Sequence, residues 1–306
     1  MNKKEDKKSA VFSNLVISEE ILKSHRELCS LLAVESIHRN HSIKRVFKDW
    51  LLKVAGLHDR SKINRFDTSV ITNRVVLKSL PDELSGLRVL QLGNLKFPLE
   101  RERTDSLYDT LRVLDYDICL LFGGIGLGIE NHILLEIEVE RLMSVLKGNV
   151  FSVLGIGDTV RSIDIMQKAG IRVLNNEFTS INILDKNIEI FGAECSNALI
   201  DPMFEPRIRS FNLADLRLFF ASNPQLRTQV SRFEFDFMLT GTQSCKHCVY
   251  RSICKWNEDA RRRPKVFKNW EIDSLKGHTS GGLGGGILDD ESHSRPELVV
   301  HEFYNE

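Results

Sequence analysis

The residue types best suited to chemistry in this 306-residue chain are cysteines and a histidine near residue 250. Cys245, His247, Cys248 and Cys254 stand in the stretch SCKHCVYRSICKW, a C-x2-C-x5-C pattern that encloses a histidine. Thiolates and an imidazole at this spacing could hold Zn²⁺ tetrahedrally, and thiolates could hold an iron–sulfur cluster. Zinc signatures usually pair two such knuckles, and only one is present. The alternative to a metal site is therefore a loop in which Cys248 and Cys254 are small packing residues.

A second set of polar residues stands where apolar runs end. Five such ends are LQLGNLKF, LLFGGIG, VLGIGD, FFASNP and MLTGTQS. The runs at 88–92, 117–122 and 150–154 are almost wholly apolar, as expected of strands that are covered on both faces. Because open α/β sheets bind ligands at the carboxyl ends of their strands, these ends predict the position of a functional site.

Helical patterns separate the first strands. Apolar residues recur at three- and four-residue spacing in the runs at 104–115, 131–148 and 162–170, and strands alternating with helices favour an α/β architecture. Later the pattern turns to strands, with a hairpin at 178–194 that has residues 185–187 at its turn.

The first 74 residues form a separate part of the pattern. Residues 1–10 are polar, and residues 16–56 have helical periodicity. The basic, amphipathic stretch at 42–56 packs on the domain or, alternatively, lies on a membrane surface. We expect an N-terminal tail and helical extension over 1–74 and one domain over 75–306.

The order and spacing of the five strand ends resemble the calcineurin-like metallophosphoesterase family. The similarity is greatest to its bacterial branch of membrane-associated phosphoesterases and UDP-diacylglucosamine pyrophosphatases. The segments LPDELSGLRVLQL, AGIRVLNNE and SGGLGGG followed by RPELVVHEF carry the resemblance as well, so that it covers residues 75–304. The resemblance implies a four-layer α-β-β-α sandwich of two mixed sheets. It also implies two divalent metal ions (Mn, Fe or Zn) that hydrolyse phosphoester or pyrophosphate bonds.

The family's metal-binding motifs are Asp-x-His, Gly-Asp, Gly-Asn-His-Asp, a His before Asn-Pro, and Gly-His-x-His. The equivalent positions here hold Asn94, Lys96, Gly124, Ile156, Gly157, Asp158, Ser222, Thr242 and Ser244. Only Asp158 keeps the family's residue type, although the glycines 123, 155 and 241 remain beside the changed positions.

These replacements argue against a dinuclear metal centre. Neutral oxygens alone do not offset the dehydration of two dications. An ammonium group at Lys96 would repel a dication about 4 Å away by several kcal/mol at an effective dielectric near 20. The histidine that would protonate a leaving group is also missing at Gly157.

The leading hypothesis is a degenerate, non-catalytic homologue that acts as a binding or regulatory protein, with no cofactor in the family site. Its expected partner is a protein or a phosphorylated or nucleotide-linked lipid, bound through Lys96 and other basic residues. One alternative is an active hydrolase whose atypical ligands include Asp158, His247, His278 and cysteines. His278 in LKGHTSGG echoes Gly-His-x-His, but it lies close to the final strand. Another alternative is a Zn or Fe–S protein that uses the knuckle at 245–254.

Composition narrows the functional classes. Lys and Arg number 42 and so do Asp and Glu, so no global field would recruit nucleic acid. No run reaches the roughly 20 apolar residues that span a bilayer, and MNKKEDKKSAVF lacks the apolar core of a signal peptide. Six cysteines in a chain of this length do not indicate a disulfide scaffold. We expect a bacterial, cytoplasmic protein, or one peripheral to the inner membrane through 42–56.

Overall fold

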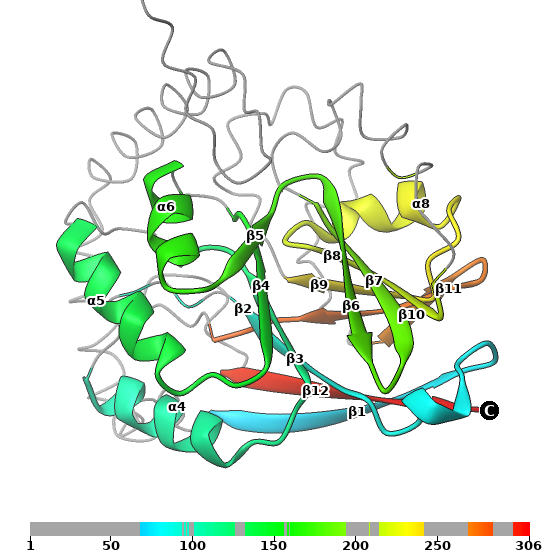
Figure 1. The fold of residues 1–306 in the computed structure, drawn as a ribbon, viewed down its shortest axis with the longest axis horizontal. Helices are drawn as coiled ribbons and strands as arrows, with labels where there is room; N and C mark the ends of the chain where they lie inside the picture. The colour runs from blue at the N-terminus through cyan, green and yellow to red at the C-terminus, as the bar shows by residue number, and fades with distance from the viewer. Residues whose placement is uncertain are drawn as a thin grey trace, which may run out of the picture.

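The fold is taken from a computed structural model of the chain (Figure 1). It describes residues 68–93, 95, 97, 101–125, 132–155, 158, 160–193, 208, 214–241, 269–283 and 296–306. Among the helices of these residues, none is long and apolar enough to cross a membrane.

The first sheet has six strands in the order β1-β12-β2-β3-β4-β5. Their bounds are Ser69–Leu77 (β1), Glu297–Asn305 (β12), Arg88–Gly93 (β2), Ile118–Phe122 (β3), Asn149–Val153 (β4) and Arg172–Leu174 (β5). β12 runs antiparallel to β2, and all other neighbours are parallel. β1 begins before the domain boundary expected at residue 75, because its nine residues pair without a break with β12.

The second sheet also has six strands, in the order β10-β11-β9-β8-β7-β6. Their bounds are Asn269–Ile272 (β10), Leu275–Ser280 (β11), Phe237–Gly241 (β9), Leu216–Ala221 (β8), Lys186–Ala193 (β7) and Glu177–Ile183 (β6). The two outer pairings are antiparallel and the inner ones parallel. The β6–β7 hairpin turns at Leu184 and Asp185, both with positive φ, so the turn is shorter and earlier than the 185–187 turn expected from the sequence.

Helices cover the outer faces of both sheets (Figure 1). The first sheet carries α4 (Arg101–Val113), α5 (His132–Met143) and α6 (Val160–Lys168), whose buried side chains share one apolar cluster with β2, β3 and β4. The second sheet carries the short helices η2 (Pro224–Leu226) and α8 (Arg227–Val230) over a phenylalanine-rich cluster. A third cluster lies between the sheets and also takes in η1 (Asp82–Leu84). The predicted four-layer α-β-β-α sandwich of two mixed sheets is confirmed.

Three aspartates fasten the starting ends of neighbouring parallel strands. Each stands one residue before a strand and accepts a hydrogen bond from a backbone N–H near the start of the next strand in the sheet. The pairs are Asp117 with Arg88 at 2.8 Å, Asp215 with Asn187 at 2.8 Å, and Asp236 with Arg217 at 2.7 Å. The backbone N–H of each aspartate donates in return to the carbonyl of its partner. A carboxylate thus replaces the carbonyl acceptor that the ladder lacks at its end.

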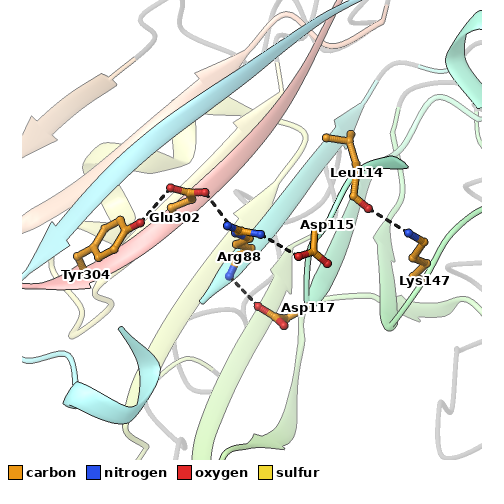
Figure 2. A network of polar contacts seen from close by, with 7 residues as sticks. All are labelled: Arg88, Leu114, Asp115, Asp117, Lys147, Glu302 and Tyr304. Carbon is orange, nitrogen blue, oxygen red and sulfur yellow. Dashed lines mark hydrogen bonds and ion pairs between the residues drawn. The ribbon is translucent and has the colours of Figure 1, made fainter. Parts of the chain in front are cut away.

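Arg88, whose backbone N–H is bonded to Asp117, also takes part in a surface network through its side chain (Figure 2). The Arg88 guanidinium contacts Asp115 at 2.9 Å and Glu302 at 3.2 Å, and Glu302 accepts a hydrogen bond from the Tyr304 hydroxyl at 3.0 Å. Asp115 is 86% exposed, and such exposed ion pairs contribute little stability. This network lies where β2 begins, at the opposite end of the strand from the predicted site, and therefore belongs to the scaffold.

Asp236 offers a test of whether these aspartates stabilise the sheet through their charge or only as hydrogen-bond acceptors. Burial raises the pKa of its carboxyl above the ordinary value, against the hydrogen bonds from Arg217 and Ser79 that lower it. As pH rises, the unfolded chain therefore ionises first, and stability falls across that interval. Asp236→Asn keeps an acceptor without the charge, so we expect unchanged or higher stability at pH 7 in urea unfolding. Asp236→Ala should lose about 1–2 kcal/mol because the half-buried Arg217 N–H is left without its acceptor. Equal losses in both variants would show instead that the charge is required.

Candidate functional site

The carboxyl ends of the parallel strands meet along one edge of the sandwich. In the first sheet Gly93 pairs with Phe122, and Phe122 pairs with Val153. In the second sheet Ala221 pairs with Thr240, and Thr240 pairs with Thr279. The strand ends that the sequence singled out are therefore level with one another within each sheet, as the topology of parallel strands requires.

Two of these strand-end loops touch through their backbones. A Cβ built on Gly123 would lie 2.0 Å from the Gly155 nitrogen, and a Cβ on Gly155 would lie 2.5 Å from the Gly124 nitrogen. Gly123 and Gly124 also have positive φ values of 48° and 67°, which side chains rarely tolerate. Gly123 and Gly155 are thus required by the close approach of the loops after β3 and β4, whereas at Gly124 the positive φ favours glycine.

Asp158 joins the same two loops. Its Oδ2 accepts hydrogen bonds from the backbone N–H of Gly124 at 2.7 Å and of Gly155 at 2.9 Å. The residue is only 1% exposed. Hydrogen bonds to a buried charged acceptor are stronger than neutral ones. Asp158 therefore holds the loop after β3 and the loop after β4 together.

The two sheets are joined at this edge by Ser222. Its Oγ donates to the Leu154 carbonyl at 3.2 Å, from the end of β8 to the end of β4. A Cβ on Gly241, at the end of β9, would lie 3.6 Å from both the Phe122 Cβ and the Ser222 carbonyl oxygen. Gly124, Asp158, Ser222 and Gly241 are thus brought to one edge across both sheets.

Apolar side chains fill much of the described edge. Leu95, Phe97, Ile125 and Leu154 are at most 3% exposed and belong to the cluster under α4, α5 and α6. The Phe97 N–H donates to the Ile125 carbonyl at 3.0 Å, which fixes the loop after β2 against the loop after β3. An apolar surrounding raises the cost of placing an unpaired charge there.

Sequence reasoning missed one carboxylate at this edge. Glu297 opens β12 and is 7% exposed. Its Oε1 accepts hydrogen bonds from the Ser280 hydroxyl and the Gly281 N–H, both at 2.9 Å. In the sequence Glu297 is one acid in RPELVV, and no local signal separates it from a surface residue.

The remaining predicted site residues have different outcomes. Asn94, Lys96, Ile156, Gly157, Thr242 and Ser244 lie outside the described residues. So do Cys245, His247, Cys248 and Cys254, and residues 42–56. His278 is described and is 2% exposed on β11, where its Nδ1 lies 2.7 Å from the Asn269 Oδ1. It lies in the interior between the sheets, two residues before β11 ends.

The described residues do not fit a pair of divalent metal ions. Gly124 offers no side chain, the Ser222 hydroxyl is bonded to a carbonyl, and the Asp158 Oδ2 already accepts two N–H groups. In the part of the chain that the structure describes, His, Cys, Asp and Glu side chains form no group of three suited to a metal. No reaction step through metal ions follows from these side chains.

Comparison with known proteins gives limited matches. No family model matches the chain. A curated 4-diphosphocytidyl-2-C-methyl-D-erythritol kinase from Francisella philomiragia is 30% identical over 126 residues, which is 40% of this chain and 43% of that kinase. The chain therefore spans less than half the length of this relative.

The similar solved structures are distant. An archaeal phosphodiesterase has a TM-score of 0.35 and 10% identity, over 64% of this chain and 84% of that one. A hypothetical protein from Thermus thermophilus has a TM-score of 0.42 and 13% identity, over 66% and 81%. Vps29 from Entamoeba histolytica, solved in complex with Zn²⁺, has a TM-score of 0.31 and 13% identity, over 66% and 80%. The fold of the chain is established by its own strand orders and layers.

Proposed function

We propose that this chain is a non-catalytic homologue of the calcineurin-like metallophosphoesterases that acts as a binding or regulatory protein. The sequence resemblance over residues 75–304 and the four-layer sandwich support the relationship. The proposal rests above all on Asp158, whose Oδ2 accepts hydrogen bonds from Gly124 and Gly155. A cation would have to compete with two N–H groups for that oxygen.

The proposed ligand is a phosphorylated or nucleotide-linked lipid. Its phosphate would be bound directly by basic side chains, because guanidinium and ammonium groups form charge-assisted hydrogen bonds with phosphate oxygens. Lys96 is the basic residue at the family site, and Arg103 on α4 donates to the Leu283 carbonyl at the same edge. A protein partner is the alternative occupant.

Binding without metal can be measured on the full chain. We expect saturable binding of UDP-diacylglucosamine, the substrate class that the resemblance implies, in excess EDTA. Lys96→Gln should weaken binding about tenfold or more, since one charge-assisted bond contributes roughly 1.5–3 kcal/mol. Lys168→Gln, at the end of α6 away from this edge, is the matched control and should bind normally. Binding that requires added Mn²⁺, or that does not depend on Lys96, would contradict the proposal.

Catalysis is tested separately, with a chromogenic phosphodiester and Mn²⁺. We expect no hydrolysis by the native chain. The variant that restores the family ligands should gain hydrolysis. Its substitutions are Asn94→Asp, Lys96→His, Gly124→Asp, Ile156→Asn, Gly157→His, Ser222→His, Thr242→His and Ser244→His. Hydrolysis by the native chain, with two Mn or Fe ions per chain after purification, would establish the active hydrolase with atypical ligands instead.

The C-x2-C-x5-C pattern supports a second candidate function, a Zn or Fe–S protein that uses Cys245, His247, Cys248 and Cys254. Elemental analysis and a visible spectrum of protein purified without added metal distinguish it. One Zn per chain, or a brown colour, that is lost in Cys248→Ser would support this function.

A further inference from the structure

A chain of polar groups crosses the apolar layer between the two sheets. It begins at His278 and ends at a backbone carbonyl, with successive heavy-atom distances of 2.7, 2.9, 3.0, 2.9 and 2.8 Å. In order, its members are His278, Asn269, Asn73, His301, Gln91 and the Thr240 carbonyl, which we call the inter-sheet relay. Three members come from the first sheet and three from the second, so the relay joins β1, β12 and β2 to β10, β11 and β9.

The directions of the hydrogen bonds follow from the last one together with the orientation of the Asn73 amide, whose Oδ1 faces Asn269. Only the Gln91 amide nitrogen can donate to the Thr240 carbonyl, so the Gln91 Oε1 must accept from the His301 Nε2–H. The Asn73 amide nitrogen faces the His301 Nδ1 and donates to it, so this Nδ1 is an acceptor and carries no proton. The same logic makes the Asn73 Oδ1 accept from Asn269. His301 is therefore neutral, with its proton on Nε2.

The surroundings of His301 favour this neutral form. The residue has no exposed surface, and its ring centroid lies 5.0 Å from that of His278 and 5.5 Å from that of Phe237. Burial, and after it the nearby His278, hold the pKa of His301 well below its ordinary value.

A proton cannot be added to His301 unless the relay is either disrupted or reversed. If the amides keep their present orientation, the added proton on Nδ1 would face the donor nitrogen of Asn73. Reversing the Asn73 and Asn269 amides would avoid that clash only if His278 also moved its proton to Nε2. The reversed relay would still hold a cation in a dry layer, beside a second imidazole. Both routes cost free energy because a buried charge lacks compensation there.

Among the described residues, the hydrogen bonds of His301 go to amides and none goes to a carboxylate. The buried Glu297 lies on the same face of β12 four residues away, and its Oε1 already accepts from Ser280 and Gly281. From β11, Lys276 lies on the same strand face as His278, and its Nζ donates to the Val76 carbonyl at 2.9 Å. From β10, Glu271 pairs in register with Lys276 and is exposed. On the first sheet, Arg74 and Glu302 directly follow Asn73 and His301, and therefore point to the opposite face. The members from β2 and β9 are an amide and a carbonyl.

The relay ends next to the candidate site. Thr240 directly precedes Gly241, and Gln91 lies two residues before Gly93, at the ends of β9 and β2. We propose that the inter-sheet relay is a pH-sensitive latch, which holds the two sheets and the strand-end site in one arrangement near neutral pH and releases it on acidification.

The test is urea unfolding of the full chain at pH 7.5 and 5.5. If the unfolded His301 has an ordinary pKa near 6.5 and the folded one stays neutral, this histidine alone raises the unfolding constant about tenfold over that interval. In His301→Gln the amide can still accept from Asn73 and donate to Gln91 but cannot titrate, so the pH dependence should shrink by that tenfold factor. His132→Gln, on α5 and outside the relay, is the matched control and should retain the tenfold factor that His301 contributes.

Hydrogen exchange on the native chain provides the second measurement. At pH 5.5, after correction for intrinsic rates, β1 and β12 should lose protection more than β4 and β8. The latch is overturned if His301→Gln retains the full pH dependence, or if exchange rises uniformly through both sheets. Should His301→Gln fail to fold, NMR titration of histidine-labelled native protein decides the question, since a His301 that protonates near pH 6 while β1 and β12 keep their exchange protection would also overturn the latch.

Discussion

Replacing Gly123 by alanine is expected to unfold the protein or to reduce its stability by about 4 kcal/mol or more, which is the range of severe disruptions. The new Cβ would lie 2.0 Å from the Gly155 nitrogen and 2.4 Å from its Cα. Both are backbone atoms, so no flexible side chain can move aside. The β3 and β4 loops would have to separate, and the Asp158 hydrogen bonds that depend on their approach would be lost with them.

Gly86→Ala is the matched control for this prediction. Gly86 also has a positive φ, of 96°, but a Cβ there would meet nothing within 4 Å. Its cost should be limited to the strain of a left-handed residue, about 1–2 kcal/mol. Urea unfolding of both variants measures the difference. Similar losses at both positions would show that φ, and not the contact between the loops, is what requires glycine at 123.

Asp158→Ala is expected to cost about 3–5 kcal/mol, because two buried N–H groups lose a charged acceptor together. Asp158→Asn should cost roughly half as much, since one amide oxygen can accept both hydrogen bonds but carries no charge. Loss of the Asp158 carboxylate should also weaken ligand binding, because the loops that Asp158 joins border the proposed site.

The control for Asp158 is Asp109→Ala. Asp109 is largely exposed on α4 and pairs with Arg112 one turn later at 2.6 Å, so its removal should change stability by at most about 0.5 kcal/mol. Chemical denaturation at pH 7 compares the three variants. If Asp158→Ala were as stable as Asp109→Ala, the carboxylate would not fasten the loops, and the main support for a non-catalytic site would fall.

The layers and strand ends could be predicted from the sequence because they depend on local patterns. Continuous apolar runs such as 117–122 indicated strands covered on both faces, and helical spacing between them indicated the covering layer. The sequence also indicated that Gly124, Asp158 and Ser222 belong at one edge. The ligand replacements at positions outside the described residues, and the cysteine knuckle, stay predictions.

The roles of particular residues at this edge were decided only by the tertiary structure. Gly123 and Gly155 looked like remnants of ligand loops, but the distance between two backbones explains them. His278 looked like a displaced metal ligand, but it belongs to a relay in which Asn73 and His301 are 228 residues apart in sequence. Hydrophobic periodicity records which face of an element is buried. It does not record which buried polar groups meet across two sheets, since that depends on packing between elements far apart in the chain.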